Sequence, residues 1–302
     1  MNIKLKLPEG YLEGETRWDH YIDPEMKKIW AVELDLLAEF DRVCKKHGLR
    51  YCAGGGTLIG TIRHKGYIPW DDDIDLVMLR DDYEKLKKIA AEEFTAPYYF
   101  QTIDSDPQAV NVIAKLRNSE TTAIRKKDMG HNYSYNQGIF IDIFPLDAVP
   151  DSKLSRYLLY AHALIYRGIY HYVASALTKK EPGIIDRILR KLARIIGGSR
   201  GEEYLQVKYY IKYDRLIRKY NKKDTKYVSM LAFNILNPRF QMYRKDLKKL
   251  TKVDYEFLKM PVPVEYDRNL RLMFGDYMTP VKGDNLHGGM LFDTEHPYTD
   301  HL

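Results

Sequence analysis

Four aspartates crowd one short stretch of the sequence, Asp71-Asp72-Asp73-Ile74-Asp75, and they are the first candidates for chemistry in the chain. The apolar residues that follow them indicate a strand, so Asp73 and Asp75 are expected on one face and Asp72 on the other. Two adjacent carboxylates repel one another unless a divalent cation lies between them, and oxygen ligands suit such a cation. The spacing therefore predicts a site for Mg²⁺ or Mn²⁺ at Asp73 and Asp75.

A run of three glycines followed by Thr57 precedes the acidic stretch. Glycines let the backbone approach a ligand closely. A helix that begins just after them directs N–H groups and the positive end of its dipole toward an anion such as phosphate. The candidates for phosphate contact are Gly55, Gly56 and Thr57, followed about one helix turn later by Arg63, His64 and Lys65. A phosphate cradle beside metal-binding carboxylates is suited to transferring a phosphorus-containing group.

A single carboxylate, Asp142, interrupts the apolar run from Gly138 to Pro145, which reads as a strand covered on both sides. Burying an unpaired carboxylate is costly, so Asp142 needs a cation or strong hydrogen-bond donors. A metal shared with Asp73 and Asp75 would meet this need. A structural salt bridge to a lysine or arginine is the rival interpretation.

The stretch from Gly56 to Leu76, GTLIGTIRHKGYIPWDDDIDL, resembles the signature of the LicD family of bacterial phosphocholine transferases, which are similar to the fukutin-type transferases of animals. The match continues at 138–150 and 261–280. The resemblance implies a nucleotidyltransferase fold, an α/β (α+β) fold with a mixed β-sheet, here carrying a helical insertion. It also favours Asp142 as a third metal ligand. Asp71 is a candidate general base, a point that the sequence leaves open.

The activity implied by the resemblance is transfer of a phospho-alcohol group, with phosphocholine favoured, from a CDP-alcohol to a hydroxyl of a cell-surface glycan or teichoic acid precursor. Two alternatives stay open. One is a nucleotidyltransferase that passes NMP to a small molecule or protein and releases pyrophosphate. The other is a non-catalytic protein that binds membranes or glycans, and the complete Asp73, Asp75 and Asp142 set argues against it.

Composition indicates a soluble globular protein, because 45% of the 302 residues are hydrophobic and 30% are charged. The first ten residues lack the apolar segment of a signal peptide, and no apolar run is long enough to span a bilayer. The two cysteines, Cys44 and Cys52, lie in apolar surroundings, as expected of buried thiols in a reducing cytosol. We therefore expect a cytoplasmic protein, with peripheral contact at the inner face of the cell membrane.

Charge is unevenly distributed along the chain. Residues 1–150 carry 20 Lys and Arg against 25 Asp and Glu, whereas residues 151–302 carry 28 against 17. We predict a catalytic core over 1–150, a basic helical insertion over 151–225, and a C-terminal part over 226–302 that packs back on the core. Helices expected in the insertion, at about 153–177, 182–196 and 202–220, suit an anionic membrane surface or are simply solvated. No nucleic-acid motif accompanies them, so nucleic acid is not an expected partner.

Several other elements should position these residues. A helix is predicted from Pro24, with Asp23 as its N-cap and Gly48 at its end, leading to a strand at 51–53. A further helix should run from a cap at Asp81 or Asp82 to about Glu93. Also predicted are strands at 98–103 and at 111–124 with a break near Asn118, a helix at 265–274 that ends at Gly275, and a loosely held tail over the last twenty residues.

Overall fold

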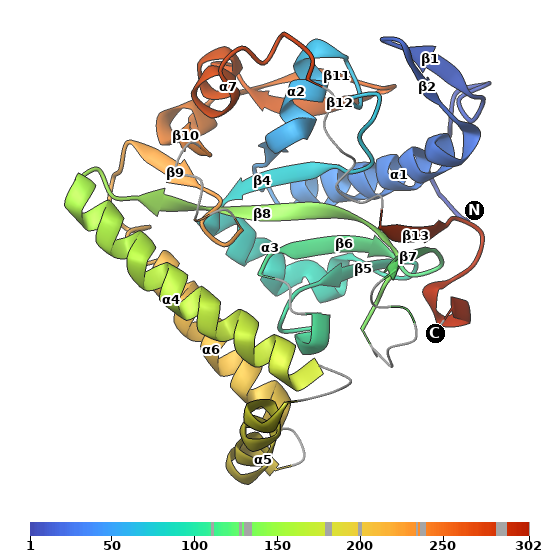
Figure 1. The fold of residues 1–302 in the computed structure, drawn as a ribbon. Helices are drawn as coiled ribbons and strands as arrows, with labels where there is room; N and C mark the ends of the chain where they lie inside the picture. Colours follow the sequence, from blue (N-terminus) through green and yellow to red (C-terminus); the bar gives the residue numbers. More distant parts are fainter. Residues whose placement is uncertain are drawn as a thin grey trace.

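The computed structural model describes residues 1–109, 112–126, 129, 135–178, 183–198, 201–233, 235, 240–281 and 289–301. This part of the chain is an α/β protein with a mixed, seven-stranded sheet. A group of helices extends from one side of the sheet (Figure 1). The predicted fold class, an α/β fold with a mixed sheet, is confirmed at this level.

Strand β8 (Ile139–Val149) is the centre of the sheet, and all of its residues are buried. It pairs in parallel with β4 (Asp75–Leu79). It also pairs antiparallel with β6 (Ala114–Asn118) through its first half and with β9 (Tyr227–Ser229) through its last residues. The predicted apolar strand around Asp142 is therefore confirmed. The outer strands are β3 (Cys52–Ala53) beside β4, β5 (Tyr98–Gln101) beside β6, and β10 (Gln241–Tyr243) beside β9.

Helix α1 (Pro24–Lys46) begins and ends as predicted. The side chain of Asp23 accepts a hydrogen bond from the backbone N–H of Met26 at 2.7 Å. Beyond the helix, Gly48 adopts a φ of +61°, a conformation that suits glycine. The middle of the helix is buried on nearly every side, as in a helix enclosed by the core. It contacts β6 and β8 and so lies directly on the sheet.

Two other helix starts differ from the sequence-based expectation. Helix α2 (Gly55–Arg63) begins within the glycine run rather than after it. Helix α3 (Arg80–Glu93) has Leu79 at its N-cap, with no side-chain hydrogen bond, so the predicted cap at Asp81 or Asp82 is wrong. The carboxylate of Asp82 instead accepts the backbone N–H of Arg50 at 3.3 Å. A bond to a residue 32 positions earlier in the chain replaces the local cap.

Three helices lie between β8 and β9, close to where the sequence predicts them: α4 (Lys153–Thr178), α5 (Ile184–Gly197) and α6 (Gly201–Ile217). Helix α4 packs along α6, and α5 covers the far end of this pair (Figure 1). The two strands that flank the helices are neighbours, with Val149 opposite Tyr227. The predicted unit boundaries at 150 and 225 stay a prediction. Within the described ranges no helix is both long and apolar enough to cross a membrane.

Two hairpins and a short helix pack near α2. The hairpins are formed by β1 (Glu15–Arg17) with β2 (His20–Ile22) and by β11 (Leu250–Tyr255) with β12 (Leu258–Pro263). Helix α7 (Tyr266–Phe274) ends at Gly275 with a φ of +70°, as predicted. Short 3₁₀ helices complete the described elements: η1 (Pro107–Ala109), η4 (Arg244–Lys248) and η5 (Tyr298–His301).

The prediction of a loosely held C-terminal tail is wrong for the residues that the structure describes; 283–288 and 302 lie outside them. Strand β13 (Met290–Asp293) pairs antiparallel with β7 (Thr122–Arg125), the strand that follows the predicted break at Asn118. The N-terminal ammonium also contacts Glu295. Backbone pairing with a segment far away in the sequence holds this region, and the polar local sequence gives no sign of it.

Candidate active site

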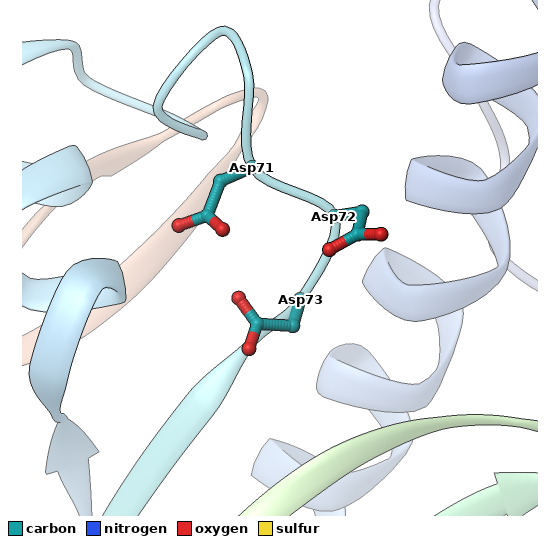
Figure 2. A group of neighbouring side chains, drawn as sticks. All are labelled: Asp71, Asp72 and Asp73. Carbon is teal, nitrogen blue, oxygen red and sulfur yellow. The ribbon is translucent and has the colours of Figure 1, made fainter. Parts of the chain in front are cut away.

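Asp71, Asp72 and Asp73 form an acidic cluster in the loop before β4. Each offers one carboxylate oxygen, and these three oxygens all lie within 4.8 Å of one another. Figure 2 shows Asp71 and Asp73 turned toward a common space, with Asp72 on the side of helix α1. Three convergent carboxylates are a donor set suited to Mg²⁺ or Mn²⁺. The residues present therefore fit the predicted metal.

The cluster corrects the predicted geometry of the acidic stretch. Strand β4 begins at Asp75, where pairing with β8 starts opposite Asp142, so Asp73 lies outside the strand. Asp72 nevertheless lies on the side of α1, away from the space that Asp71 and Asp73 face, as expected (Figure 2). One of its carboxylate oxygens still lies within 4.8 Å of oxygens of Asp71 and Asp73. The predicted set of Asp73, Asp75 and Asp142 and the observed cluster share Asp73.

The glycine turn at the start of α2 lies against the acidic stretch. A Cβ added to Gly55 would lie 2.8 Å from a carboxylate oxygen of Asp75, and one added to Gly56 would lie 3.0 Å from a carboxylate oxygen of Asp71. Gly55 also has a φ of +45°. Larger residues would therefore collide with the acids or strain the backbone. The N–H groups of the first helical turn, which lack partners within the helix, thus lie beside the carboxylates.

Thr57 connects α2 to the start of β4. Its hydroxyl oxygen accepts the backbone N–H of Asp75 at 2.8 Å, and the residue is buried. The side chain therefore positions Asp75, a role that the sequence did not indicate. Contact between Thr57 and a phosphate stays a prediction, and its backbone N–H lies in the appropriate turn of the helix.

The environment of Asp73 opposes its ionisation. Removal from water raises the pKa of Asp73 well above its usual range, and the nearby charges of Asp75 and Asp71 raise it further. Glu33 on α1 is buried behind the cluster, and burial likewise raises the pKa of its carboxyl. Carboxyl groups that resist ionisation when clustered gain most from a cation that offsets their charge.

A pair of stacked rings supports the cluster from behind. The rings of Trp30 and Tyr67 lie 4.3 Å apart at an interplanar angle of 2°. The Trp30 indole N–H donates to the backbone carbonyl of Asp71 at 3.0 Å, and the Tyr67 hydroxyl donates to Glu33 at 2.9 Å. Sequence reasoning missed this arrangement. An acid within the apolar run of α1 was the available signal for Glu33.

Asp142 has a lysine partner. The ammonium of Lys115 lies 2.5 Å from its carboxylate, and both side chains are largely buried. Lys115 stands directly opposite Asp142 in the pairing of β6 with β8, while Asp75 stands opposite it on β4. The salt bridge that was the rival interpretation of Asp142 is thus present in the structure. Its predicted role as a metal ligand stays a prediction, and Asp142 is not part of the acidic cluster.

We expect Asp142→Asn to lower the free energy of unfolding of the metal-free protein by about 1–3 kcal/mol, because the substitution leaves the Lys115 ammonium without a counter-charge. The loss is limited because Lys115 can release its proton, and burial already lowers the pKa of this lysine. Urea denaturation of the single variant and of Asp142→Asn/Lys115→Met measures the effect. The double variant should recover part of the loss. If Asp142→Asn had the same free energy of unfolding as the wild type, the salt bridge would not stabilise the fold, and the metal would be the partner that Asp142 requires.

Arg63, His64 and Lys65 lie at the opposite end of α2, about 12 Å along the helix axis from Gly55. One Arg63 amino group donates to the carbonyl of Tyr277 at 2.5 Å, and its Nε donates to the His64 ring at 2.8 Å. Lys65 lines a separate pocket of about 520 Å³. The structure therefore does not bring these three residues to the glycine turn. Their predicted contact with phosphate stays a prediction without geometric support.

His64 should make stability fall in acid. Its partial burial, next to the charges of Arg63 and Arg17, lowers its pKa from 6.5 to about 4. The unfolded chain therefore takes up a proton at a higher pH than the folded chain, and stability should decrease as the pH falls from 6.5 to about 4. His64→Gln should flatten this part of the curve. Chemical denaturation of both proteins across that range tests it, and identical slopes would contradict the assignment to His64.

Comparisons with known proteins find relatives of this chain. Residues 48–165 match the family described as LicD/FKTN/FKRP, nucleotidyltransferase domain. The chain is 28% identical over 261 residues to a lipopolysaccharide cholinephosphotransferase, LicD, of Haemophilus influenzae, covering 84% of this chain and 93% of that protein. It is also 35% identical over 54 residues to an uncharacterized protein of Rickettsia prowazekii, 18% of this chain and 20% of that protein.

The matched segment contains the glycine turn, the acidic cluster and Asp142, whereas Trp30 and Glu33 lie before it. It runs from the end of α1 through the glycine turn, the acidic cluster and β8 into the first part of α4. The resemblance identified from the residues between Gly56 and Leu76 is therefore confirmed. By this segment, and over most of both chains in the case of the Haemophilus protein, the chain is similar to the LicD family of transferases.

Proposed function

We propose that this protein transfers a phospho-alcohol group, with phosphocholine favoured, from a CDP-alcohol to a hydroxyl of lipopolysaccharide or another cell-surface glycan precursor, with Mg²⁺ or Mn²⁺ as cofactor. Similarity to the LicD family model and to the cholinephosphotransferase supports an enzyme that transfers a substituted phosphate group. The donor, the acceptor and the metal are our proposal. We also assign the mixed sheet to the nucleotidyltransferase fold, and the reaction to the cytoplasm, in keeping with the two buried free thiols.

The observation that carries the proposal is the meeting of the acidic cluster with the glycine turn. Asp71 and Asp75 lie against the first turn of α2, and Asp72 and Asp73 complete the carboxylate group. The turn supplies N–H donors for phosphate oxygens, while the carboxylates would hold the metal. When bound, the metal would offset the negative charge of the diphosphate. Neither half of this arrangement would serve a protein that only binds a neutral glycan.

In this proposal the acceptor hydroxyl attacks the phosphorus that carries the alcohol. A new P–O bond forms to the acceptor, and the P–O bond to the CMP phosphate breaks, so that CMP leaves. Asp71, whose carboxylate lies beside Gly56, is the proposed group that takes the proton from the hydroxyl. The N–H groups at Gly55 and Gly56 hold the phosphate in position.

Identification of the released nucleotide tests the proposal. The full chain is incubated with Mg²⁺, CDP-choline and lipopolysaccharide that lacks phosphocholine, in parallel with CDP-ribitol, CDP-glycerol and CTP. CMP release that depends on the acceptor, together with phosphocholine on the glycan, is the expected result with CDP-choline. Pyrophosphate release from CTP would instead indicate nucleotidyl transfer. Absence of turnover with every donor, while the fold is intact, would contradict the proposed reaction.

A further inference from the structure

Helix α5 exposes most of its apolar residues to solvent. At 100° per residue, its isoleucines and its exposed leucine fall within an arc of about 120°. The exposed fractions of these side chains range from 47% to 76%. Burial on folding therefore does not explain this face, which a surface helix normally turns toward the core. The α5 apolar face consists of Ile184, Ile185, Ile188, Leu192, Ile195 and Ile196.

Basic residues occupy an adjoining arc of α5. Arg187, Arg190, Lys191 and Arg194 span about 100° of the helix, and Lys191 borders the apolar face. The single acid of the helix, Asp186, is buried. The remaining side, which includes Ala193, packs on α4 and α6. The helix thus has one side for packing, one apolar side and one cationic side.

The outer side of α4 extends the exposed apolar surface. Leu154, Tyr157 and Ile165 are 69%, 70% and 59% exposed, and their spacing places them on one side of the helix. Tyr172, on the same side near the end of α4, is 47% exposed, and its hydroxyl lies 3.4 Å from Asp186 on α5. Both surfaces belong to the helices that extend away from the sheet (Figure 1).

We infer that the α5 apolar face and its basic arc dock this protein on a bilayer that contains anionic phospholipid, with the outer side of α4 adding apolar contact. An apolar face flanked by arginine and lysine is the arrangement of helices that lie in the membrane interface. Charge complementarity decides the occupant. A second copy would bring another basic arc to the same interface. Anionic headgroups instead attract basic residues, and each such residue raises the affinity for the membrane about fivefold. The inference does not depend on the proposed reaction.

Vesicle flotation of the full chain tests the inference. Vesicles of phosphatidylcholine alone are compared with vesicles in which a third of the lipid is phosphatidylglycerol. The protein should float with the anionic vesicles and not with the neutral ones. Binding should weaken as salt approaches 1 M, where the Debye length is about 3 Å. Equal binding to neutral vesicles, or no binding at low salt, would overturn the inference.

Matched variants localise the contact. Lys191→Glu/Arg194→Glu should weaken binding at least about 25-fold, and Ile188→Ser/Ile195→Ser at least about tenfold. Lys88→Glu on α3 and Val264→Ser, both exposed and away from α5, are the controls and should bind as wild type does. Serine has nearly the helix propensity of isoleucine, and thermal melts check that each variant folds. Binding that the α5 variants leave unchanged would contradict the assignment to this helix.

A thiol label measures insertion directly. Both native cysteines are buried, so Ile195→Cys provides a selective site for an environment-sensitive fluorophore. The emission should shift to the blue on anionic vesicles, whereas a label at Lys88→Cys should not respond. Sedimentation velocity completes the set. A dimer that Ile188→Ser/Ile195→Ser dissociates, together with no shift at residue 195, would show that a second copy occupies the face instead.

Discussion

Asp73→Asn is expected to lower turnover at least about a thousandfold, equivalent to about 4 kcal/mol of lost transition-state stabilisation. Asp73 belongs both to the metal pair predicted from the sequence and to the acidic cluster in the structure. Neutralising it removes a negatively charged ligand from a divalent cation that must hold the donor diphosphate. The side chains of asparagine and aspartate have nearly the same size, so the loss should come from chemistry rather than from packing.

The same substitution should stabilise the metal-free protein. The surroundings of Asp73 raise its pKa, so keeping this group ionised at neutral pH opposes folding. Asparagine removes that penalty. Thermal melts in EDTA should therefore show an equal or higher melting temperature for the variant, and Mg²⁺ with CDP-choline should stabilise the wild type more than the variant. Asp81→Asn, at an exposed position on α3, is the matched control. Activity within about tenfold of wild type would refute a metal role for Asp73.

Arg80→Met is expected to lower the free energy of unfolding by about 3–5 kcal/mol, the usual result of stranding a buried charge. Arg80 makes two hydrogen bonds to Asp147, at 2.9 and 2.6 Å, one to Asp214 at 3.1 Å and one to Glu84 at 3.2 Å. Asp147 is fully buried on β8 and Arg80 is 5% exposed. This ion pair joins α3 to the central strand, and the bond to Asp214 joins both to α6. Because arginine keeps its proton, loss of one partner cannot be relieved by neutralising Arg80, and the buried pair requires both side chains in place.

Urea denaturation of Arg80→Met and of Arg80→Met/Asp147→Leu measures the cost. The double variant should regain much of the loss, because it removes both buried charges. The deficit of Arg80→Met should also narrow as the pH falls, since burial raises the pKa of Asp147 and its protonation in the fold relieves the stranded charge. Arg42→Met removes an exposed pair with Glu39 and should cost no more than about 1 kcal/mol. A similar cost at both sites would contradict the argument.

The sequence was sufficient to predict those features that neighbouring residues determine. Asp23 caps α1 by reaching three residues ahead, and Gly48 and Gly275 follow helices that end in the conformation that suits glycine. The proximity of the glycines to the acids was also predictable, because the glycines stand at the start of the short helix α2 and the aspartates follow soon after its end. In these cases the determining interaction lies within a few positions of the residue concerned.

The remaining features depend on pairing between distant segments. The place where β4 begins is set by its register with β8, and this register makes Asp75, opposite Asp142, the first residue of the strand and leaves Asp73 in the loop before it. The partner of Asp142 is Lys115 because β6 aligns with β8 at that residue. Likewise, β13 is ordered by β7. A shift of one residue in the register of a strand turns every one of its side chains to the other face of the sheet. Composition alone does not determine the register.

The pairing of Val149 with Tyr227 bears on how the chain could change over evolutionary time. Residues directly opposite each other in an antiparallel ladder lie only about 5 Å apart, a gap that a tight turn could also bridge. The three helices between them can therefore be lengthened, shortened or exchanged without altering the order of the strands. What restrains such change is the anchoring of α6, where Tyr213 is buried and Asp214 binds Arg80.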